Sequence, residues 1–468
     1  MKKLNLSGKD LRRIGFEDDQ AISIAKNLLE KHYKHHKKAD VLELLSDFLD
    51  QPDKYENHEV LGKLAAYMKR PKKQKPAEIS LHSAPIHYPV YGAQEIDEAT
   101  LQQMNTAMRL PIALKGALMP DAHHGYGLPI GGVMATRNEI IPFAVGMDIG
   151  CRMCLTVYDI PVNYFKAEQS RLIKLLEKNT RFGRKELSDI HDHPILQRTE
   201  FREIPFLRSL LTKARQQLGT SGSGNHFVDM GILRIDQKTD KLGNLEPGKY
   251  FAILSHSGSR NMGAEIAKHY TSIAKEKCIL PKGASQLAWL NLDTEEGTEY
   301  WKAMNLAGDY SASNHELIHK SLAKALGEKP VLTIENHHNF AWKEKLDDGS
   351  EAIVHRKGAT PAHPGQTAII PGSMTTHAYI VEGLGEPESI YSASHGAGRL
   401  MSRAQAKKSF SKKDLRDNLE KADVILLGGS IDEASMAYKN IDHIMKYQDK
   451  LVKTLAVFSP RIVRMSSS

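Results

Sequence analysis

The sequence predicts a protein of the α+β or mixed α/β class whose functional residues lie in loops at strand ends. Two observations lead to this prediction. After residue 85, short apolar runs end in clusters of Gly, Ser, His and Asn, which is typical of buried strands that deliver polar residues to loops. The segments 165–177 and 315–326 have the periodicity of helices. Because binding and catalytic residues concentrate on loops held by a rigid scaffold, the polar clusters are the candidate site.

Residues 1–75 are predicted to form a basic, helical N-terminal region, followed by a second domain at residues 76–468. Apolar residues recur at helical spacing over 19–50. The region carries 17 Lys and Arg against 12 Asp and Glu, which is +5 of the formal charge of +8. The segment 69–76 is basic and contains two prolines, so it is the predicted linker. A charge excess of this kind indicates either a solvated helical face or an anionic partner.

Four apolar runs in the second domain are predicted strands. The first leads to Asp148 and Cys151, the second to His256, the third to His338 and the last to a Gly-Gly pair. The runs are 143–145, 251–254, 331–334 and 424–427.

The composition excludes membrane-spanning and disulfide-stapled proteins. The chain has 468 residues, of which 41% are hydrophobic and 26% are charged. Its apolar runs fall short of the 18 or so residues of a membrane span, and its N-terminus has no apolar signal-peptide core. Its three cysteines form an odd, sparse set, which predicts a reducing cytoplasm.

The segment Ser392–Arg399 is the most informative loop. Gly396 and Gly398 flank Ala397 and let backbone N–H groups approach an anion closely. Arg399 adds a cation suited to phosphate. The pair Ile390-Tyr391 predicts a strand that ends here, with His395 where a nucleophile would stand. The alternative is a Gly-rich turn that contains an incidental histidine.

Five residues in the strand-to-loop segments are candidate metal ligands. A carboxylate and a thiolate lie three residues apart, and three histidines follow on separate loops. Each histidine alone could be structural, but together they could hold one or two divalent ions, and their softness favours Zn²⁺. The candidates are Asp148, Cys151, His226, His256 and His338.

Two further motifs have competing interpretations. Cys151 and Cys154 form a CxxC, but the chain has no second CxxC for a four-cysteine zinc ribbon and nothing else that resembles a thioredoxin unit. Residues 315–319 match the HExxH of zinc proteases. The favoured alternative is an ordinary amphipathic helix, in which Ser313 and Glu316 form a capping box. Gly327 would end this helix.

Two more loops are rich in Gly and Pro. Residues 119–132 form one that carries Asp121, His123 and His124, and residues 370–376 form another that carries Ser373. Both could be rigid turns or could cradle a phosphate.

Taken together, these segments resemble the RtcB family of RNA-splicing ligases. The resemblance follows the family's order and covers about residues 85–445. Its carriers are Met119-Pro120-Asp121-x-His123, Gly146-x-Asp148-Ile149-x-Cys151, Gly222-x-Gly224-Asn225-His226-Phe227, His256-Ser257-Gly258-Ser259-Arg260, Asn336-His337-His338-Asn339, His355-Arg356-Lys357-Gly358-Ala359-Thr360-Pro361, Pro371-Gly372-Ser373-Met374 and Ser392–Arg399.

The resemblance implies layered β-sheets with flanking helices and a GTP- and Mn²⁺-dependent ligase. Such an enzyme joins an RNA 3′-phosphate or 2′,3′-cyclic phosphate to a 5′-hydroxyl, in RNA repair or tRNA splicing. His395 would attack the α-phosphorus of GTP and form a guanylyl-histidine, assisted by Asp121. The five candidate ligands would hold two Mn²⁺ ions, with Cys151 shared. The implied nucleotide contacts are Asn225, Asn339, Ser373, Gly396, Ala397, Gly398, Arg399 and Tyr438.

Three departures from the family suggest a divergent paralogue. The family's C-terminal lysine, which contacts guanine, is missing, and Arg461 or Arg464 is the expected substitute. Arg152 replaces a glycine that commonly follows the metal-binding cysteine, which predicts a cation beside the metals. The basic N-terminal region lies outside the motif set. Two other functions therefore compete, a metal-dependent RNA-end phosphodiesterase and a non-ligating RNA-binding protein.

Overall fold

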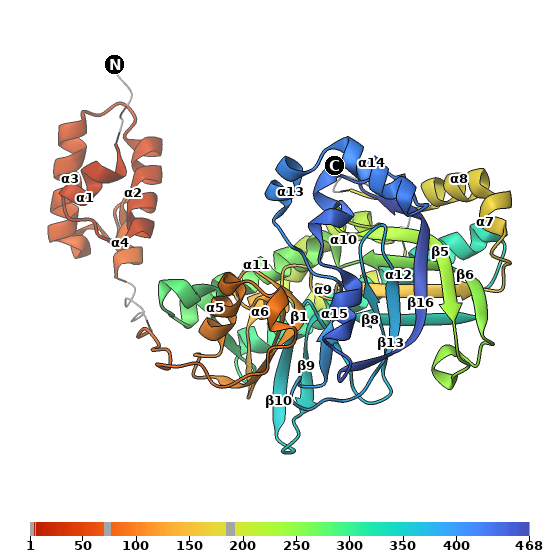
Figure 1. Ribbon diagram of the computed structural model, residues 1–468. Helices are drawn as coiled ribbons and strands as arrows, with labels where there is room; N and C mark the ends of the chain where they lie inside the picture. The colour runs from red at the N-terminus through yellow and green to blue at the C-terminus, as the bar shows by residue number, and fades with distance from the viewer. Residues whose placement is uncertain (1–3, 5, 70–75, 184–191, 468) are drawn as a thin grey trace. The chain divides into compact units, whose positions relative to one another are not determined.

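The computed structural model describes residues 4, 6–69, 76–183 and 192–467 (Figure 1). The chain divides into two compact units, Met1–Pro76 and Ala77–Ser468. Most of the predicted linker at 69–76 lies outside the described residues. Among the residues that are described, no helix has the length and apolar content needed to cross a membrane.

The N-terminal unit consists of helices around a core of its own. Its α-helices are α1 (Gly8–Arg13), α2 (Asp19–His32), α3 (Lys38–Asp50) and α4 (Gly62–Met68). Each helix contributes a fully buried leucine to this core, and these are Leu11, Leu29, Leu45 and Leu64. The stretch predicted to be helical over 19–50 is therefore two helices, separated at residues 33–37.

The second unit is built around an eight-stranded sheet whose neighbours are antiparallel along most of its width. One short strand, β15 (Ile425–Leu427), pairs parallel to β16. The other strands lie in the order β12 (Thr367–Pro371), β13 (Ala378–Gly383), β16 (Val452–Met465), β5 (Phe227–Ile235), β6 (Gly248–Ser257), β4 (Arg152–Tyr158) and β8 (Leu332–His337).

This large sheet curls until its two edge strands approach each other. The side chain of Asn336 in β8 accepts a hydrogen bond from the backbone N–H of Ile369 in β12, at 2.9 Å. The curled sheet encloses a core to which β4, β5, β6, β8, β12, β13 and β16 all contribute buried apolar side chains.

Three smaller sheets complete the strands of this unit among its described residues. A four-stranded antiparallel sheet has the order β1 (Ala113–His123), β2 (Ile130–Thr136), β10 (Glu351–Lys357) and β9 (Asn339–Lys345). Two-stranded sheets pair β11 (Ala359–Pro361) with β14 (Ser392–Ser394), and β3 (Glu139–Ile140) with β7 (Leu290–Asn291).

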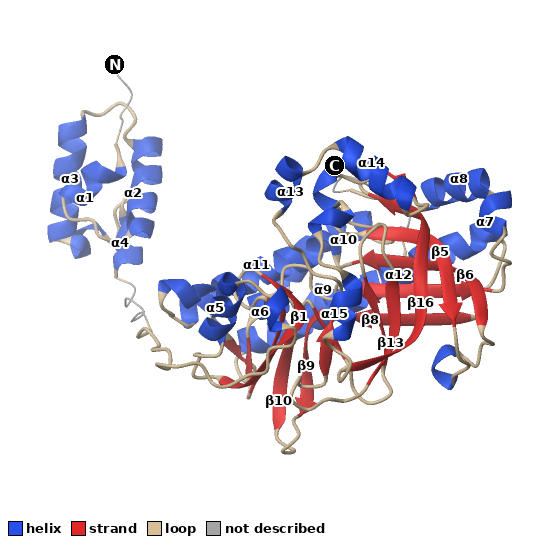
Figure 2. Ribbon diagram, in the orientation of Figure 1, coloured by secondary structure: helices blue, strands red, loops and turns tan. Residues whose placement is uncertain are grey.

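Helices flank these sheets (Figure 2). The long helix α12 contacts β4 and β6, and its Ile318 and Leu322 share a buried cluster with Phe251 and Ile253 of β6. We call this side of the large sheet its reverse face. The helices are α5 (Glu98–Ala107), α6 (Pro142–Val145), α7 (Tyr164–Ala167), α8 (Gln169–Asn179), α9 (Glu200–Glu203), α10 (Pro205–Gln217), α11 (Arg260–Lys277), α12 (Glu295–Leu326), α13 (Arg403–Ser409), α14 (Lys412–Lys421) and α15 (Ile441–Lys446).

The layered α+β architecture confirms the predicted fold class. Strands β6, β8 and β15 overlap the predicted strands at 251–254, 331–334 and 424–427, although β6 and β8 extend up to three residues beyond them. The run 143–145 is helical rather than extended, because Pro142 begins a short helix there. The pair Ile390-Tyr391 is not a strand either, since both residues have positive φ (52° and 49°) and β14 begins after them.

The capping-box interpretation of Ser313 is wrong. Helix α12 begins at Glu295, where the Thr294 side chain caps it, so Ser313 lies in its middle and donates to the carbonyl of Asp309. Gly327 ends the helix in the left-handed conformation, as predicted. The short apolar pattern at 315–326 is the last third of a 32-residue helix.

A buried arginine ties β10 to the segment that precedes His395. The side chain of Arg356 is fully buried and forms a two-pronged ion pair with Glu344, with N···O distances of 2.7 and 2.8 Å. It also donates to the Ser392 hydroxyl at 2.7 Å and to the Ile390 carbonyl at 2.9 Å. Glu344 and these two oxygens thus satisfy a charge that would be costly to bury alone.

We predict that Arg356→Lys lowers the free energy of unfolding by about 3–5 kcal/mol, because an ammonium cannot make the paired contacts and leaves Glu344 underpaired. Arg234→Lys is the control, since Arg234 pairs with Asp236 at an exposed surface; its expected cost is under about 0.5 kcal/mol. Urea unfolding of both variants measures the difference. Equal losses of unfolding free energy would show that the buried ion pair does not hold β10 to the segment before His395.

A buried histidine makes stability depend on pH. His355 in β10 accepts a hydrogen bond from the Ile141 N–H at 3.0 Å, and burial lowers its pKa to about 4. The unfolded histidine titrates near pH 6.5 and binds more protons between these values, so stability falls as the pH drops from about 6.5 to about 4. We predict that His355→Gln makes this decline shallower by up to about 1.4 kcal/mol per pH unit. Urea unfolding at pH 5, 6 and 7 tests it; an unchanged slope would contradict the assignment.

Candidate active site

Strand register gathers the candidate metal ligands at one end of the large sheet. Arg152, the first residue of β4, pairs with Ser257 of β6 and with His337 of β8. Phe227, the first residue of β5, pairs with His256. Because these neighbouring strands end together, the side chains at or beside their ends meet, and we call this the ligand end of the sheet. It carries Cys151, His226, His256 and His338.

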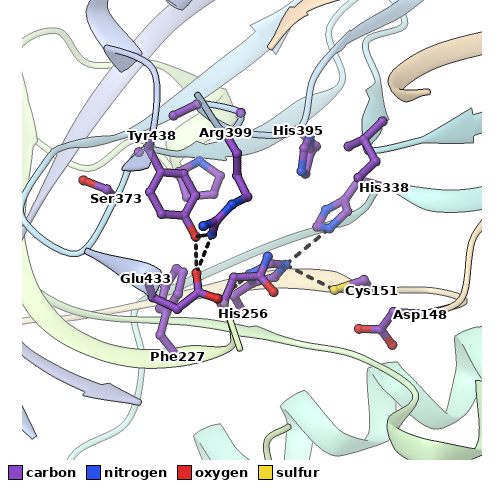
Figure 3. A pocket seen from close by; sticks show the side chains of 18 of the residues that line it. Asp148, Cys151, Phe227, His256, His338, Ser373, His395, Arg399, Glu433 and Tyr438 are labelled. Atoms are coloured by element: carbon purple, nitrogen blue, oxygen red, sulfur yellow. Dashed lines mark hydrogen bonds and ion pairs between the residues drawn. The ribbon is translucent and has the colours of Figure 1, made fainter. Parts of the chain in front are cut away.

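Figure 3 shows four of the candidate ligands, Asp148, Cys151, His256 and His338, on one side of the pocket. Cys151 Sγ lies 3.1 Å from His256 Nε2 and 3.5 Å from His226 Nε2. His226 Nε2 in turn lies 2.9 Å from Asp148 Oδ2, and His256 Nε2 lies 3.3 Å from His338 Nε2. All five residues predicted as metal ligands therefore converge, and four of them are buried.

The protonation states in this cluster suit a divalent cation. His256 Nδ1 lies 3.1 Å from the Asn225 carbonyl, so it donates there and leaves the Nε2 lone pair facing Cys151. Burial lowers the pKa of His256 to about 3, and that of His338 well below its usual range, so both imidazoles are neutral and could act as metal ligands. Burial and Asp148 raise the pKa of the Cys151 thiol, which binding of a cation would offset.

His395 is held by a buried carboxylate. Its Nδ1 lies 2.6 Å from Asp121 Oδ2, and Asp121 is fully buried in β1. The same oxygen accepts from the backbone N–H groups of His395 and Gly396, at 3.2 and 3.3 Å. Nδ1 therefore carries the proton, and Nε2 keeps its lone pair. The His395 and His338 rings are 5.0 Å apart between centroids, so this lone pair belongs to the same site as the metal ligands.

Two contacts hold Asp121 in place from behind. Buried Lys439 donates from Nζ to the carbonyls of Pro120 and Ala122, at 3.1 and 2.7 Å. On the other side Gly398 has a φ of +76°, and a Cβ there would lie 2.1 Å from the Asp121 carbonyl oxygen. Position 398 therefore requires glycine, because both its backbone conformation and its close approach exclude a side chain.

A cavity of about 510 Å³ opens over these groups. All of the predicted site residues line this cavity except Asp121 and His226, which lie just beneath its surface. Those in the lining are Asp148, Cys151, Asn225, His256, His338, Asn339, Ser373, His395, Gly396, Ala397, Gly398, Arg399 and Tyr438.

The part of the cavity away from the metal ligands is formed around Arg399 (Figure 3). Its guanidinium lies 4.9 Å from the centre of the Tyr438 ring and donates to Glu433 Oε2 at 3.1 Å. It also donates to the backbone carbonyls of Met401 and Asp432. The guanidinium of Arg399 is therefore occupied by contacts within the protein and forms part of the cavity wall. The sequence had suggested instead that it is available to bind phosphate.

Comparison with known proteins decides the family. A family model described as tRNA-splicing ligase RtcB matches residues 102–204 and 205–466. The chain belongs to the RtcB family. It is 33% identical over 414 residues to the RNA-splicing ligase RtcB of Escherichia coli K12, which covers 81% of this chain and 96% of that protein. It is 29% identical over 435 residues to the tRNA-splicing ligase RtcB of Nanoarchaeum equitans, and this match covers 78% of this chain and 91% of that protein. The resemblance inferred from the motifs is confirmed.

Two expectations about this RtcB-family chain's departures are wrong. Arg152 does not lie beside the metal ligands, because alternation along β4 turns it to the reverse face, where it pairs with Glu335 at 3.0 Å. Arg464 packs 5.8 Å from the Phe182 ring centre, and Arg461 points toward Asp423. Neither arginine therefore fills the place of the family's C-terminal lysine. The C-terminal strand instead presents Pro460, Val463 and Met465 to the cavity.

Sequence reasoning missed four charged residues of the RtcB cavity, which are Asp229, Lys357, Arg403 and Glu433. Asp229 is buried in β5, its Oδ1 has no hydrogen-bond partner among the described residues, and burial raises its pKa. Burial lowers the pKa of Lys357 to about 7. A lone acid inside the apolar run 227–235 was the available signal for Asp229. Lys357 lies in the motif at residues 355–361, but the sequence did not indicate a role for it.

We predict that Gly398→Ala destabilises the protein more than Gly349→Ala does. Gly349 has a similar φ of +80°, but a Cβ there would meet open space, so its substitution measures backbone strain alone. The added clash with the Asp121 carbonyl is expected to cost a further 1–3 kcal/mol or so. Urea unfolding of the two variants gives the comparison, and equal losses would mean that the loop yields without cost.

Proposed function

We propose that this chain is a GTP- and Mn²⁺-dependent RNA ligase that joins RNA 3′-phosphate or 2′,3′-cyclic phosphate ends to 5′-hydroxyl ends. RNA repair or tRNA splicing would be its setting. Membership of the RtcB family and the names of its relatives support RNA ligation. The observation that carries the mechanism is the buried Asp121–His395 pair beside the candidate metal ligands, since it leaves His395 Nε2 free to act as a nucleophile in the cavity of about 510 Å³.

His395 performs the first transfer. Its Nε2 attacks the α-phosphorus of GTP, an N–P bond forms, and the bond to pyrophosphate breaks, which leaves a guanylyl-histidine. Asp121 accepts the hydrogen bond from Nδ1–H throughout, so it orients the ring and stabilises the positive charge that develops on it. The RNA 3′-phosphate then takes the guanylyl group from Nε2, and the 5′-hydroxyl displaces GMP as the phosphodiester bond forms.

Asp148, Cys151, His226, His256 and His338 are the residues that would hold the two metal ions. Bound there, divalent cations would neutralise phosphoryl charge and orient the attacking and leaving oxygens. The chain supplies the rigidity: Asn225 orients His256 through its carbonyl, and the Ser259 N–H donates to Asp148 Oδ1 at 3.2 Å. The thiolate and imidazoles alone would favour Zn²⁺, whereas the family resemblance supports Mn²⁺.

The guanine base is proposed to bind in the part of the cavity around Tyr438. The Tyr438 ring supplies an aromatic surface, and Met465 and Val463 supply apolar ones. Asp229 offers a buried carboxyl oxygen with no partner among the described residues, which the N–H groups on the edge of guanine would satisfy. Backbone N–H groups of Gly396–Arg399, with Asn225, Asn339 and Ser373, are the proposed polar contacts to the nucleotide.

The organisation of the chain completes this proposal. The ligase domain would extend over residues 76–468, and the basic helical region 1–75 would be an addition that favours an anionic partner such as RNA. The three cysteines are free and buried. A reducing cytoplasm would keep Cys151 available as a ligand.

Incubation with GTP labelled at the α-phosphate and Mn²⁺, followed by a denaturing gel, tests the mechanism. We expect acid-labile label on the protein that His395→Ala removes and that the control His443→Ala keeps, since His443 is exposed outside the cavity. Absence of label from the unmodified chain would overturn the guanylyl-histidine. Metal-dependent opening of cyclic phosphate ends that survives His395→Ala without any ligation by the unmodified chain would favour the phosphodiesterase instead.

We also predict that Asp121→Asn slows guanylylation about 10²–10⁴-fold. An amide can donate to Nδ1 and would favour the tautomer that carries its proton on Nε2, which removes the nucleophilic lone pair. The rate of label incorporation measures the effect, and GTP affinity is expected to change little because Asp121 lies behind the cavity wall. A rate within threefold of the unmodified protein would show that the carboxylate does not set the tautomer.

A further inference from the structure

A second cluster of metal-ligand side chains lies on the reverse face of the large sheet. Cys154, His315 and His319 each offer one ligand atom, and these atoms lie within 4.8 Å of one another. All three residues are at least nine-tenths buried. Cys151 and Cys154 are three positions apart, so strand alternation turns Cys151 to the cavity and Cys154 toward α12. The two clusters therefore occupy opposite faces of the same strand.

This cluster unites residues of two sequence motifs, the CxxC and the HExxH, that the proposed ligase mechanism leaves without a role. Cys154 is the second cysteine of the CxxC, and the histidines are those of the HExxH, four residues apart on one face of α12. Glu316, which would be the general base of a zinc protease, is exposed and points away from them. The arrangement thus retains the metal-binding part of HExxH and lacks its catalytic part.

Hydrogen bonds orient both imidazoles toward one point. His315 Nε2 lies 3.1 Å from the Ser257 carbonyl, so it must donate there, which leaves a lone pair on Nδ1. His319 Nδ1 lies 2.8 Å from Thr156 Oγ1, which also lies 3.2 Å from the Tyr158 hydroxyl. In the tautomer that donates from Nδ1 to Thr156, His319 presents its lone pair on Nε2. Anchoring one ring nitrogen by a hydrogen bond is how proteins orient the imidazoles that bind metals.

The two imidazoles meet at a single hydroxyl. Ser255 Oγ lies 2.7 Å from His315 Nδ1 and 2.7 Å from His319 Nε2, but a hydroxyl has one proton to donate. When both nitrogens present lone pairs, one of them faces an oxygen that cannot donate to it, which is unfavourable in a buried site. A cation at this point would satisfy both nitrogens, with the Cys154 sulfur and the Ser255 oxygen beside it.

We propose that Cys154 Sγ, His315 Nδ1 and His319 Nε2 bind a structural Zn²⁺ ion, with Ser255 Oγ in the fourth position. Thiolate and imidazole are both usual ligands of Zn²⁺, whose preferred tetrahedron has bonds of about 2.0–2.3 Å. Binding replaces the proton of the Cys154 thiol, which is released to solvent. The ion would link α12 to β6 next to His256, because Ser255 would bind the ion and the Ser257 carbonyl accepts a hydrogen bond from His315. All four coordination positions would be filled by the chain, so the site would be structural.

Cobalt spectroscopy of the full-length chain separates this site from the active site. In Cys151→Ser the ligand end no longer has a thiolate, so any thiolate-to-cobalt charge-transfer band must come from another cysteine. We expect Cys151→Ser loaded with Co²⁺ to show such a band, and the added change Cys154→Ser to remove it. Adding Cys278→Ser instead, at the chain's third buried cysteine, is expected to keep the band.

Zinc content provides a second measurement that needs neither GTP nor RNA. Relative to the unmodified chain, His319→Asn is expected to lose one equivalent of zinc by mass spectrometry, whereas Cys278→Ser loses none. A Co²⁺-loaded Cys151→Ser protein without a charge-transfer band would overturn the proposal, and so would a band that depends on Cys278. Because Cys151→Ser retains all three proposed ligands, this result holds even where Cys154→Ser does not fold, and it is independent of whether the chain ligates RNA.

Discussion

The common register of four antiparallel strands is the constraint on which the rest of the site depends. The pairing of Arg152 with both Ser257 and His337 ends β6, β4 and β8 at the same level, and the pairing of Phe227 with His256 adds β5. A shift of one residue in any of these pairings would turn a ligand to the opposite face of the sheet. Backbone hydrogen bonds therefore set the positions of side chains that come from segments up to about 190 residues apart in the chain.

Buried hydrogen bonds then decide which nitrogen of each imidazole is available. The Asn225 carbonyl takes the Nδ1 proton of His256, and Asp121 takes that of His395. The Ser257 carbonyl does the same for Nε2 of His315 on the reverse face. In each case one ring nitrogen is fixed as a donor so that the other presents a lone pair, which is what both metal binding and nucleophilic attack require. For His256 and His315, burial also lowers the pKa, which favours the neutral imidazole.

The two faces of β4 are coupled through β6. His256 projects toward the cavity, while its neighbours Ser255 and Ser257 contact the histidines of α12. The loop that carries His395 is fixed separately, since Arg356 holds its approach at Ile390 and Ser392, and Asp121 holds its backbone N–H groups. The proposed nucleophile and the candidate metal ligands thus lie at the ends of different sheets that meet at one cavity. Rigid support on both sides suits transfer chemistry, in which small displacements are costly.

The sequence by itself determined the fold class and the family, and it singled out candidate site residues that the structure brings together, because glycine-rich loops and ligand-type side chains at strand ends are local features of the chain. Only the tertiary structure decided orientation. Arg152 follows Cys151 directly but lies on the opposite face of the sheet. Arg464 packs on Phe182, outside the cavity, whereas Met465 and Asp229 line the cavity. The HExxH histidines meet Cys154 rather than a substrate. The reason is physical: which face a side chain occupies depends on strand register and helix packing, which arise from contacts between segments far apart in the sequence.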